Sequence, residues 1–227
     1  MRKIGLVGGI SWVSTIEYYK LINQGIQKEL GGLNYAECIM YSINFGELQK
    51  IGWANSYQLL FNACKTLQEA NADCIVLCAN TAHMFIDQLQ KEISIPIIDI
   101  VLETAIEVKK HTINYVGLLG TKVTMEQDFF TKKLEQNNIE VIIPGDQYTR
   151  DYIQNTLKNE LGKGVFSTET KSKYLFIINK MIDEGAQGII LACTEIPLFL
   201  TKEDIRVPVF NTTQIHSNAA INFAINK

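Results

Sequence analysis

The sequence predicts an α/β fold made of two pseudo-symmetric domains, each a parallel sheet flanked by helices. Two observations lead to this prediction. Short runs of Val, Ile and Leu alternate along the 227 residues with longer segments of helical period, which is the pattern of βαβ units. In addition, three short patterns from the first half of the chain recur in the second half in the same order, which indicates an internal duplication.

Eight segments have the length and the branched apolar content of buried strands, and helical segments fill most of the chain between them. The predicted strands cover residues 3–7, 36–43, 74–78, 96–98, 115–119, 140–143, 188–192 and 207–210. Two helix starts are also predicted. Ser14 and Thr124 are each followed three residues later by Glu17 or Gln127, which is the pattern of a capping box.

The recurrence has a nearly constant spacing. Residues 4–9 (IGLVGG) match 116–121 (VGLLGT) and residues 95–99 (IPIID) match 207–211 (VPVFN), both 112 positions later, while residues 75–81 match 189–195 at an offset of 114. Two insertions account for the difference. Matching strands would place their carboxyl ends face to face across a cleft, where α/β proteins bind ligands. We therefore expect the active site in that cleft, where the loops after Cys78 and Ala192 meet.

The domain boundaries follow from the two Pro-containing repeats. The chain is expected to cross between domains near Pro96 and near Pro208, and the last helix to return to the first domain. Residues 1–97 and 210–227 then form the first α/β domain, and residues 98–209 form the second.

Composition excludes several classes of function. The net charge is −3 and no basic run is present, so nucleic acid is not expected as a partner. The apolar runs have the length of strands, which argues against a membrane-spanning segment. Five cysteines are an odd number in a chain of this size, which favours free thiols in a reducing compartment. We expect a cytoplasmic protein.

Three motifs invite a ligand but have simpler interpretations. The glycine-rich turn at residues 5–9 lacks the spacing of a nucleotide-binding loop, so its glycines more simply allow a tight turn near a small anion, with Ser11 as a donor. Cys74 and Cys78 share one buried strand, and no metal site is expected there. His83 either orients the cleft or is a satisfied core residue, and we favour the core residue.

Cys193 stands apart because of its position. It follows a predicted buried strand, and Thr194 and Glu195 open the next turn. A thiol at the amino end of a helix has its pKa lowered by the helix dipole and the nearby N–H groups, which gives a reactive thiolate. A small buried apolar residue is the alternative. Position alone leaves both interpretations open.

Four segments resolve that choice by resemblance. Residues 5–12 (GLVGGISW), 78–83 (CANTAH), 118–121 (LLGT) and 192–196 (ACTEI) resemble those of the aspartate/glutamate racemase superfamily. The similarity runs nearly end to end and is greatest to bacterial L-aspartate/glutamate-specific racemases. It implies a homodimer of two-domain subunits that uses no pyridoxal phosphate, metal or other cofactor. It also implies a cysteine on each face of the substrate Cα, where one removes the proton and the other supplies one.

The sequence departs from this pattern at its first cysteine. The residue before the Asn80-Thr81 pair is Ala79, which cannot carry a proton, so Cys193 is the one catalytic thiol that the resemblance leaves. Cys78 is adjacent, but neighbouring strand side chains point to opposite faces, so it is expected to face away. Racemisation is then slow or biased in direction, with water, Thr81 or Cys78 supplying the second proton.

The remaining site residues are predicted to bind an amino acid or a dicarboxylate. The resemblance assigns the α-carboxylate to the loops after the two matching strands, and the distal carboxylate to Lys163. Gln49 and Lys50, after the second predicted strand, are further candidates for the distal carboxylate. The predicted substrate-binding residues are Ser11, Gln49, Asn80, Thr81, Thr121, Lys163, Thr194 and Glu195. Two other functions stay open: a disabled protein that binds a dicarboxylate or amino acid, and a single-thiol decarboxylase or isomerase.

Overall fold

The protein is described by a computed structural model that covers residues 1–226. The chain folds into two compact units. Unit 1 holds Met1–Ile100 and the chain from His216 onward, and unit 2 holds Val101–Ile215. These crossings lie three and six residues later than the predicted ones. The second crossing moves because residues 209–211 pair with the unit 2 sheet and because the last helix begins in unit 2.

Unit 1 is built on a three-stranded parallel sheet of order β2-β1-β3. Its strands are β1 (Ile4–Gly8), β2 (Cys38–Ser42) and β3 (Cys74–Leu77). Its helices are α1 (Trp12–Leu30), α2 (Phe45–Ile51), η1 (Trp53–Asn55), α3 (Tyr57–Glu69), η2 (Thr81–Phe85) and α4 (Ile86–Glu92). The carboxyl ends of β1 and β3 lie side by side, since Val7 pairs with Leu77.

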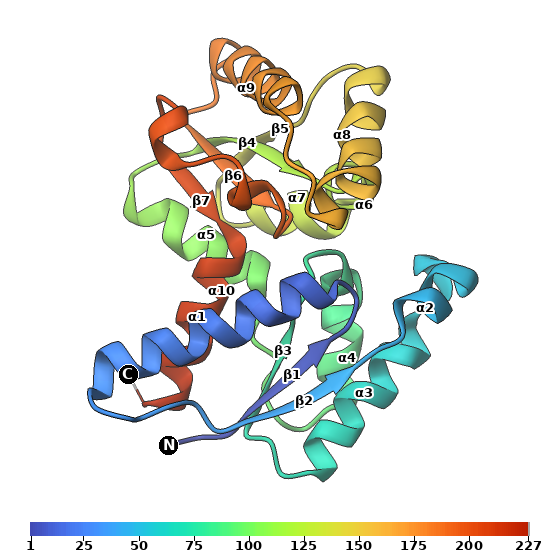
Figure 1. Ribbon diagram of the computed structural model, residues 1–227, viewed down its shortest axis with the longest axis vertical. Helices are drawn as coiled ribbons and strands as arrows, with labels where there is room; N and C mark the ends of the chain where they lie inside the picture. Colours follow the sequence, from blue (N-terminus) through green and yellow to red (C-terminus); the bar gives the residue numbers. More distant parts are fainter. Residues whose placement is uncertain (227) are drawn as a thin grey trace. The chain divides into compact units, whose positions relative to one another are not determined.

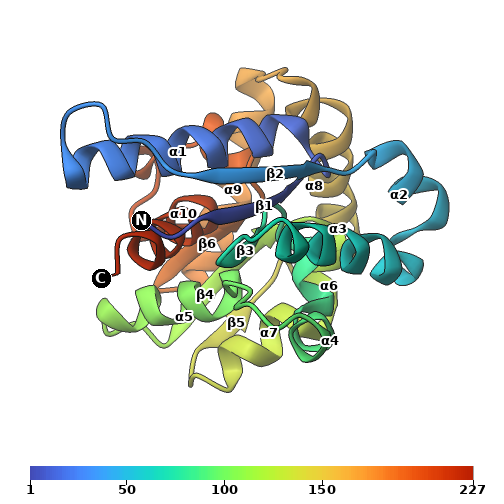
Figure 2. The same cartoon turned by 90° about the horizontal axis from the view of Figure 1, so that it is seen from below.

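The two faces of this sheet are covered by different helices (Figures 1 and 2). Ile75 and Leu77 face a core supplied by α3 and α4. Val76 and Cys78 face a second core, supplied by α1 and by the unit 1 part of α10 (Thr212–Ala224). Successive strand residues thus alternate between the cores, as the pleat requires.

Unit 2 repeats this plan on a four-stranded parallel sheet of order β5-β4-β6-β7. Its strands are β4 (Tyr115–Gly120), β5 (Glu140–Ile142), β6 (Gly188–Ala192) and β7 (Val209–Asn211). Its other elements are α5 (Ile100–Lys110), whose first residue belongs to unit 1, α6 (Lys122–Glu126), α7 (Asp128–Glu135), α8 (Gln147–Asn159), η3 (Leu161–Lys163), α9 (Thr168–Asp183), η4 (Ile196–Leu198) and η5 (Lys202–Asp204). Helices α8 and α9 pack on the face that carries Leu119, Ile189 and Leu191. Helices α5 and α7 lie on the other face (Figures 1 and 2).

The internal duplication is visible in the backbone hydrogen bonds. Ile75 in β3 donates its N–H to the carbonyl of Pro96, and Ile189 in β6 donates its N–H to the carbonyl of Pro208, both at 2.9 Å. The prediction of a strand at 96–98 is wrong in extent, because only a single bridge forms there, between Ile75 and Ile97. The other seven predicted strands are confirmed with small shifts at their ends.

The predicted helix starts need correction. The N-caps are Ser11 and Thr121, which have extended backbones and accept the N–H groups of Ser14 at 3.3 Å and of Thr124 at 3.2 Å. Ser14 and Thr124 themselves lie inside the first helical turn. The capping-box pattern therefore marked the right helices but was assigned three residues too late.

The glycine-rich turn after β1 is explained by close packing. Gly9 has a φ of +83°, and a Cβ placed on it would lie 2.2 Å from the carbonyl oxygen of Ile43. Its N–H donates to Thr15 Oγ1 at 3.0 Å. The tight turn is thus confirmed, and it directs β1 into α1.

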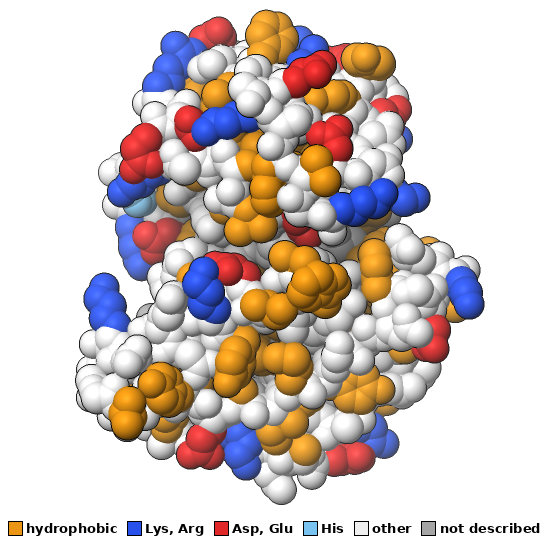
Figure 3. Space-filling model, viewed as in Figure 1, with side chains coloured by type: hydrophobic (Ala, Val, Ile, Leu, Met, Phe, Trp, Pro, Cys, Tyr) orange, Lys and Arg blue, Asp and Glu red, His pale blue; other side chains and the backbone are white. Residues whose placement is uncertain are grey.

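The surface carries mixed charges. On the face drawn in Figure 3, Lys and Arg side chains are interspersed with Asp and Glu side chains. Within residues 1–226, no helix combines the length and the apolar character needed to span a membrane.

Candidate functional site

The carboxyl edge of the unit 2 sheet gathers several predicted site residues. Gly120 pairs with Ala192, so β4 and β6 end together and are followed by Thr121 and Cys193. Thr194 and Glu195 come next and lead into η4. This edge is where parallel α/β sheets bind ligands.

Cys193 is held by a carboxylate. Its Sγ donates to Glu195 Oε2 at 2.9 Å, and Thr194 Oγ1 donates to the same oxygen at 2.8 Å. Cys193 is half-buried, whereas Glu195 is buried with 7% of its surface exposed. A buried carboxylate that accepts from a thiol forms an acid–base pair through which a proton can pass.

The predicted lowering of the Cys193 pKa is wrong. Burial of the thiol, followed by the negative charge and the hydrogen bond of Glu195, raises the pKa well above its ordinary value. The N–H groups of Glu195 and Thr194 act in the opposite direction but are outweighed. A short 3-10 turn follows the thiol in place of an α-helix, so little helix dipole is available. Cys193 therefore rests as a neutral thiol.

The matching loop in unit 1 contains no thiol at the corresponding place. Ala79 follows Cys78 at the end of β3, and its methyl group packs against the core shared with α3 and α4. Cys78 packs into the opposite core and is 1% exposed, as expected from the pleat. Asn80 and Thr81 are also buried, and Thr81 begins η2. The Asn80 Oδ1 atom has no hydrogen-bond partner.

His83 is a buried core residue, as the sequence favoured, but only one of its two ring nitrogens has a hydrogen-bond partner. It is 1% exposed, and its Nδ1 contacts the carbonyl oxygen of Ala79 at 3.0 Å. Its Nε2 is buried without a hydrogen-bond partner. An orphaned buried nitrogen is uncommon and needs an explanation.

Ser11 and Thr121 occupy equivalent places in the two units. Each follows the first strand of its unit, β1 or β4, and each uses its hydroxyl oxygen to cap the next helix. Their role toward a substrate stays a prediction. The hydroxyl hydrogen of a capping residue can still be donated, because the cap uses a lone pair of the oxygen.

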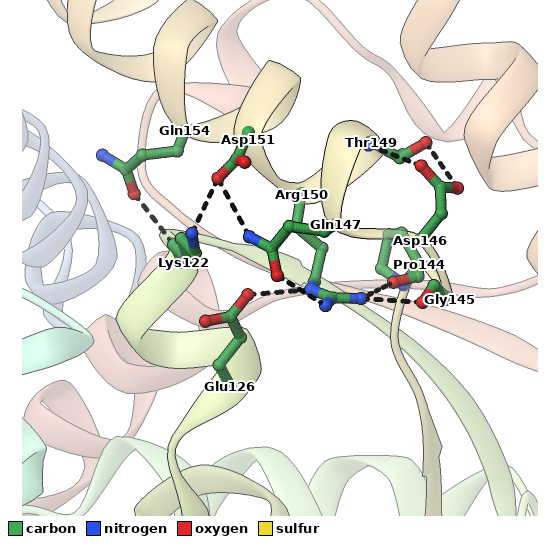
Figure 4. Close-up of polar contacts among 10 residues, drawn as sticks. All are labelled: Lys122, Glu126, Pro144, Gly145, Asp146, Gln147, Thr149, Arg150, Asp151 and Gln154. Carbon is green, nitrogen blue, oxygen red and sulfur yellow. Dashed lines mark hydrogen bonds and ion pairs between the residues drawn. The ribbon is translucent and has the colours of Figure 1, made fainter.

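Two cations, Lys122 in α6 and Arg150 in α8, are bonded to acceptors within the protein (Figure 4). Lys122 Nζ contacts Asp151 Oδ1 at 2.7 Å, and Arg150 contacts Glu126 Oε1 and the carbonyl of Pro144. These contacts tie α6 to α8 and leave both cations less available to a ligand. Lys163, at the end of η3, and Gln49, in α2, are exposed, and their role toward a distal carboxylate stays a prediction.

The structure adds polar residues that sequence reasoning missed. Leu191 pairs with Asn211, so the end of β7 joins the edge that carries Cys193. Thr212 Oγ1 donates to the carbonyl of Leu191 at 3.1 Å, and Thr213 Oγ1 is buried without a hydrogen-bond partner. The recurrence of residues 95–99 at 207–211 could have drawn attention to them.

Residues 1–226 contain no group of three or more His, Cys, Asp or Glu side chains arranged to hold a metal ion. All five cysteines are free thiols.

Comparison with known proteins identifies the family. Residues 7–220 match the Asp/Glu/hydantoin racemase family, and the chain belongs to it. A solved structure of a candidate Asp/Glu racemase from Yersinia pestis is 41% identical, covers 99% of this chain and 100% of that chain, and has a TM-score of 0.92. The broad specificity amino-acid racemase RacX of Bacillus subtilis (strain 168) is 24% identical over 227 residues, which is 96% of each protein.

A more distant structure carries a ligand. Glutamate racemase from Francisella tularensis subsp. tularensis SCHU S4, solved in complex with D-glutamate, is 18% identical, covers 99% of this chain and 81% of that chain, and has a TM-score of 0.71. At this identity the likeness shows the fold alone.

Proposed function

We propose that this protein is an amino-acid racemase that moves the Cα proton of aspartate- or glutamate-like substrates through the thiol of Cys193. Membership of the racemase family supports the class of reaction. The observation that carries the assignment to Cys193 is its hydrogen bond to buried Glu195 at the carboxyl edge of the sheet. The family and its members support the substrate class: the matching family is that of Asp/Glu/hydantoin racemases, the Yersinia pestis relative is a candidate Asp/Glu racemase, and RacX is a broad specificity amino-acid racemase.

The raised pKa of Cys193 defines the order of proton movements. At rest the thiol holds the proton. Its transfer to Glu195 leaves a thiolate, whose electron pair then takes the proton from Cα. The electrons of the broken C–H bond stay on Cα and are delocalised into the α-carboxylate. In the opposite sense, the neutral thiol protonates this carbanion and Glu195 returns a proton to sulfur.

The second proton transfer is the weak step of this proposal. Ala79 has no exchangeable proton, and Cys78 is packed in an apolar core where burial raises its pKa. Water or Thr81 would have to act in their place. We therefore propose that racemisation is slow or favours one direction, while the overall equilibrium constant stays unchanged.

Proton exchange at Cα is the direct test. The protein is incubated in deuterium oxide with L-Asp, D-Asp, L-Glu or D-Glu, and the Cα signal is followed by NMR. Loss of that signal with at least one of them is the expected result, because even half of the reaction introduces deuterium. Absence of exchange with all four amino acids, at substrate concentrations that saturate the enzyme, contradicts the proposal.

Two further measurements separate the alternatives. Binding of an amino acid or dicarboxylate without exchange, measured by calorimetry, would identify a disabled binding protein. Carbon dioxide release from a substituted malonate would identify a single-thiol decarboxylase instead.

A further inference from the structure

Three buried side chains of unit 1 form a connected group beside the Ala79 loop. Tyr18, from α1, places its hydroxyl 2.9 Å from His216 Nδ1, and His216 Nε2 lies 2.8 Å from the carbonyl oxygen of Ile98. The ring of His216 contacts the ring of His83 edge-on, with centroids 5.3 Å apart and planes at 71°. His83 in turn contacts the carbonyl of Ala79.

These contacts assign the hydrogen on each ring. A carbonyl oxygen can only accept, so His216 carries its hydrogen on Nε2 and His83 carries its hydrogen on Nδ1. His216 Nδ1 is then the acceptor for the Tyr18 hydroxyl. Both rings are neutral, since burial lowers the pKa of each, that of His216 to about 3. The two histidines are held in opposite tautomers.

The contact between His83 and Ala79 determines the direction of a neighbouring N–H group. The carbonyl of Ala79 and the N–H of Asn80 belong to one planar trans peptide, so they point in opposite directions. A ring that holds the carbonyl also fixes where the N–H of Asn80 points. That N–H belongs to the loop predicted to bind the α-carboxylate of the substrate.

We propose that His83 is a positioning residue for substrate binding, which orients the Ala79–Asn80 peptide and is itself held by His216 and Tyr18. This inference rests on the proposed function, because it concerns the loop that would take the substrate carboxylate. The orphaned Nε2 of His83 and Oδ1 of Asn80 support it. Buried acceptors without partners are typical of sites completed by a ligand or a bound water.

Two substitutions of His83 separate positioning from packing. The amide nitrogen of Asn can take the place of Nδ1, whereas that of Gln takes the place of Nε2. His83→Asn therefore keeps a donor for the Ala79 carbonyl, and His83→Gln removes it. We expect His83→Gln to raise the KM for Cα exchange about five- to tenfold, the usual effect of one lost hydrogen bond, with a smaller change in kcat. His83→Asn should restore most of the KM.

A milder variant covers the case in which His83 variants do not fold. Tyr18→Phe removes only the hydroxyl that holds His216, and we expect a KM about two- to threefold higher, since the ring packing is kept. His111→Asn is the matched control, because His111 lies exposed at the end of α5 and should leave the KM unchanged. Equal KM values in wild type, His83→Gln and Tyr18→Phe would overturn the proposal.

A measurement on the unliganded wild type keeps this inference separate from the proposed function. Long-range ¹H–¹⁵N NMR of the imidazoles should show His83 protonated on Nδ1 and His216 on Nε2. His83 protonated on Nε2 would overturn the positioning role even in an active enzyme. If the expected tautomers are found but no amino acid undergoes exchange, the proposed function fails while the contact to Ala79 stands.

Discussion

The loop after β3 and the loop after β6 have the same place in their sheets and different chemistry. Each follows a strand that pairs with the first strand of its unit and that donates an N–H to a proline carbonyl. The loop after β6 carries a thiol bonded to a buried carboxylate. The loop after β3 carries a methyl group at Ala79, with two neutral histidines behind it. The two strands thus keep the same backbone contact to a proline, while the loops that follow them differ in the side chains they offer for the proposed proton transfer.

Among the variants that test this difference between the two loops, removal of the thiol should have the largest effect on the rate of Cα exchange. Cys193→Ala deletes the group that we propose to take or give the Cα proton, and we expect the exchange rate to fall about a thousandfold or more, the upper part of the range for general acid–base groups. NMR of Cα deuteration measures it. Cys78→Ala is the matched control, since Cys78 lies in a core of unit 1. An equal loss in both variants would indicate a packing effect in place of catalysis.

Restoring a thiol to the other loop should have the next largest effect. Ala79→Cys supplies the proton carrier that this position lacks, and we expect reversible turnover to rise about tenfold to a hundredfold. Circular dichroism that follows racemisation from each enantiomer separately measures both directions. An unchanged rate in a folded variant would show that residue 79 does not take part in the reaction.

Removing the carboxylate beside Cys193 should have two smaller effects in opposite directions: the thiol should be alkylated faster, and Cα exchange should be slower. Glu195→Gln removes the charge and the anionic acceptor that raise the Cys193 pKa, so the pKa should fall toward its ordinary value. Alkylation of Cys193 at pH 8 should then be about threefold to tenfold faster, because more thiolate is present. The exchange rate should drop about tenfold, since the proton acceptor for the thiol is lost.

Peptide mass spectrometry assigns alkylation to Cys193 among the five free thiols. The alkylation rate of half-buried Cys38 serves as an internal reference, because burial raises its pKa to about 11 and Glu195 is not among the causes. Slower alkylation of Cys193 in Glu195→Gln would mean that the carboxylate favours the thiolate, contrary to this account.

The sequence predicted the strands and the duplication well because both depend on local patterns. Runs of branched apolar residues mark buried strands wherever they occur. The segment at 96–98 was overestimated because the number of ladder bonds it makes depends on where the chain turns after Ile98, which no local pattern records.

The site was predicted less completely because it depends on side-chain directions. The sequence places Glu195 two residues after Cys193 but does not show that its carboxylate turns back to the sulfur and raises the pKa. The ring contact between His83 and His216 joins positions far apart in the chain, and no local sequence pattern signals it. Side-chain contacts of this kind become visible only in the folded protein.

His83 and His216 of unit 1 should lower the free energy of unfolding in acid. The loop after β6 has no equivalent pair of histidines behind it. Burial lowers the pKa of His83 and His216 below the ordinary 6.5. Below that pH the unfolded chain binds protons that the folded chain does not, so stability present above pH 6.5 is lost as the pH falls toward about 3. Each histidine should contribute a slope of up to about 1.4 kcal/mol per pH unit to the free energy of unfolding.

Urea unfolding between pH 6.5 and 5, above the range of most carboxylates, measures this slope. His83→Asn should remove about half of the histidine part. Equal slopes in this variant and the wild type would show that the pair is already protonated when folded.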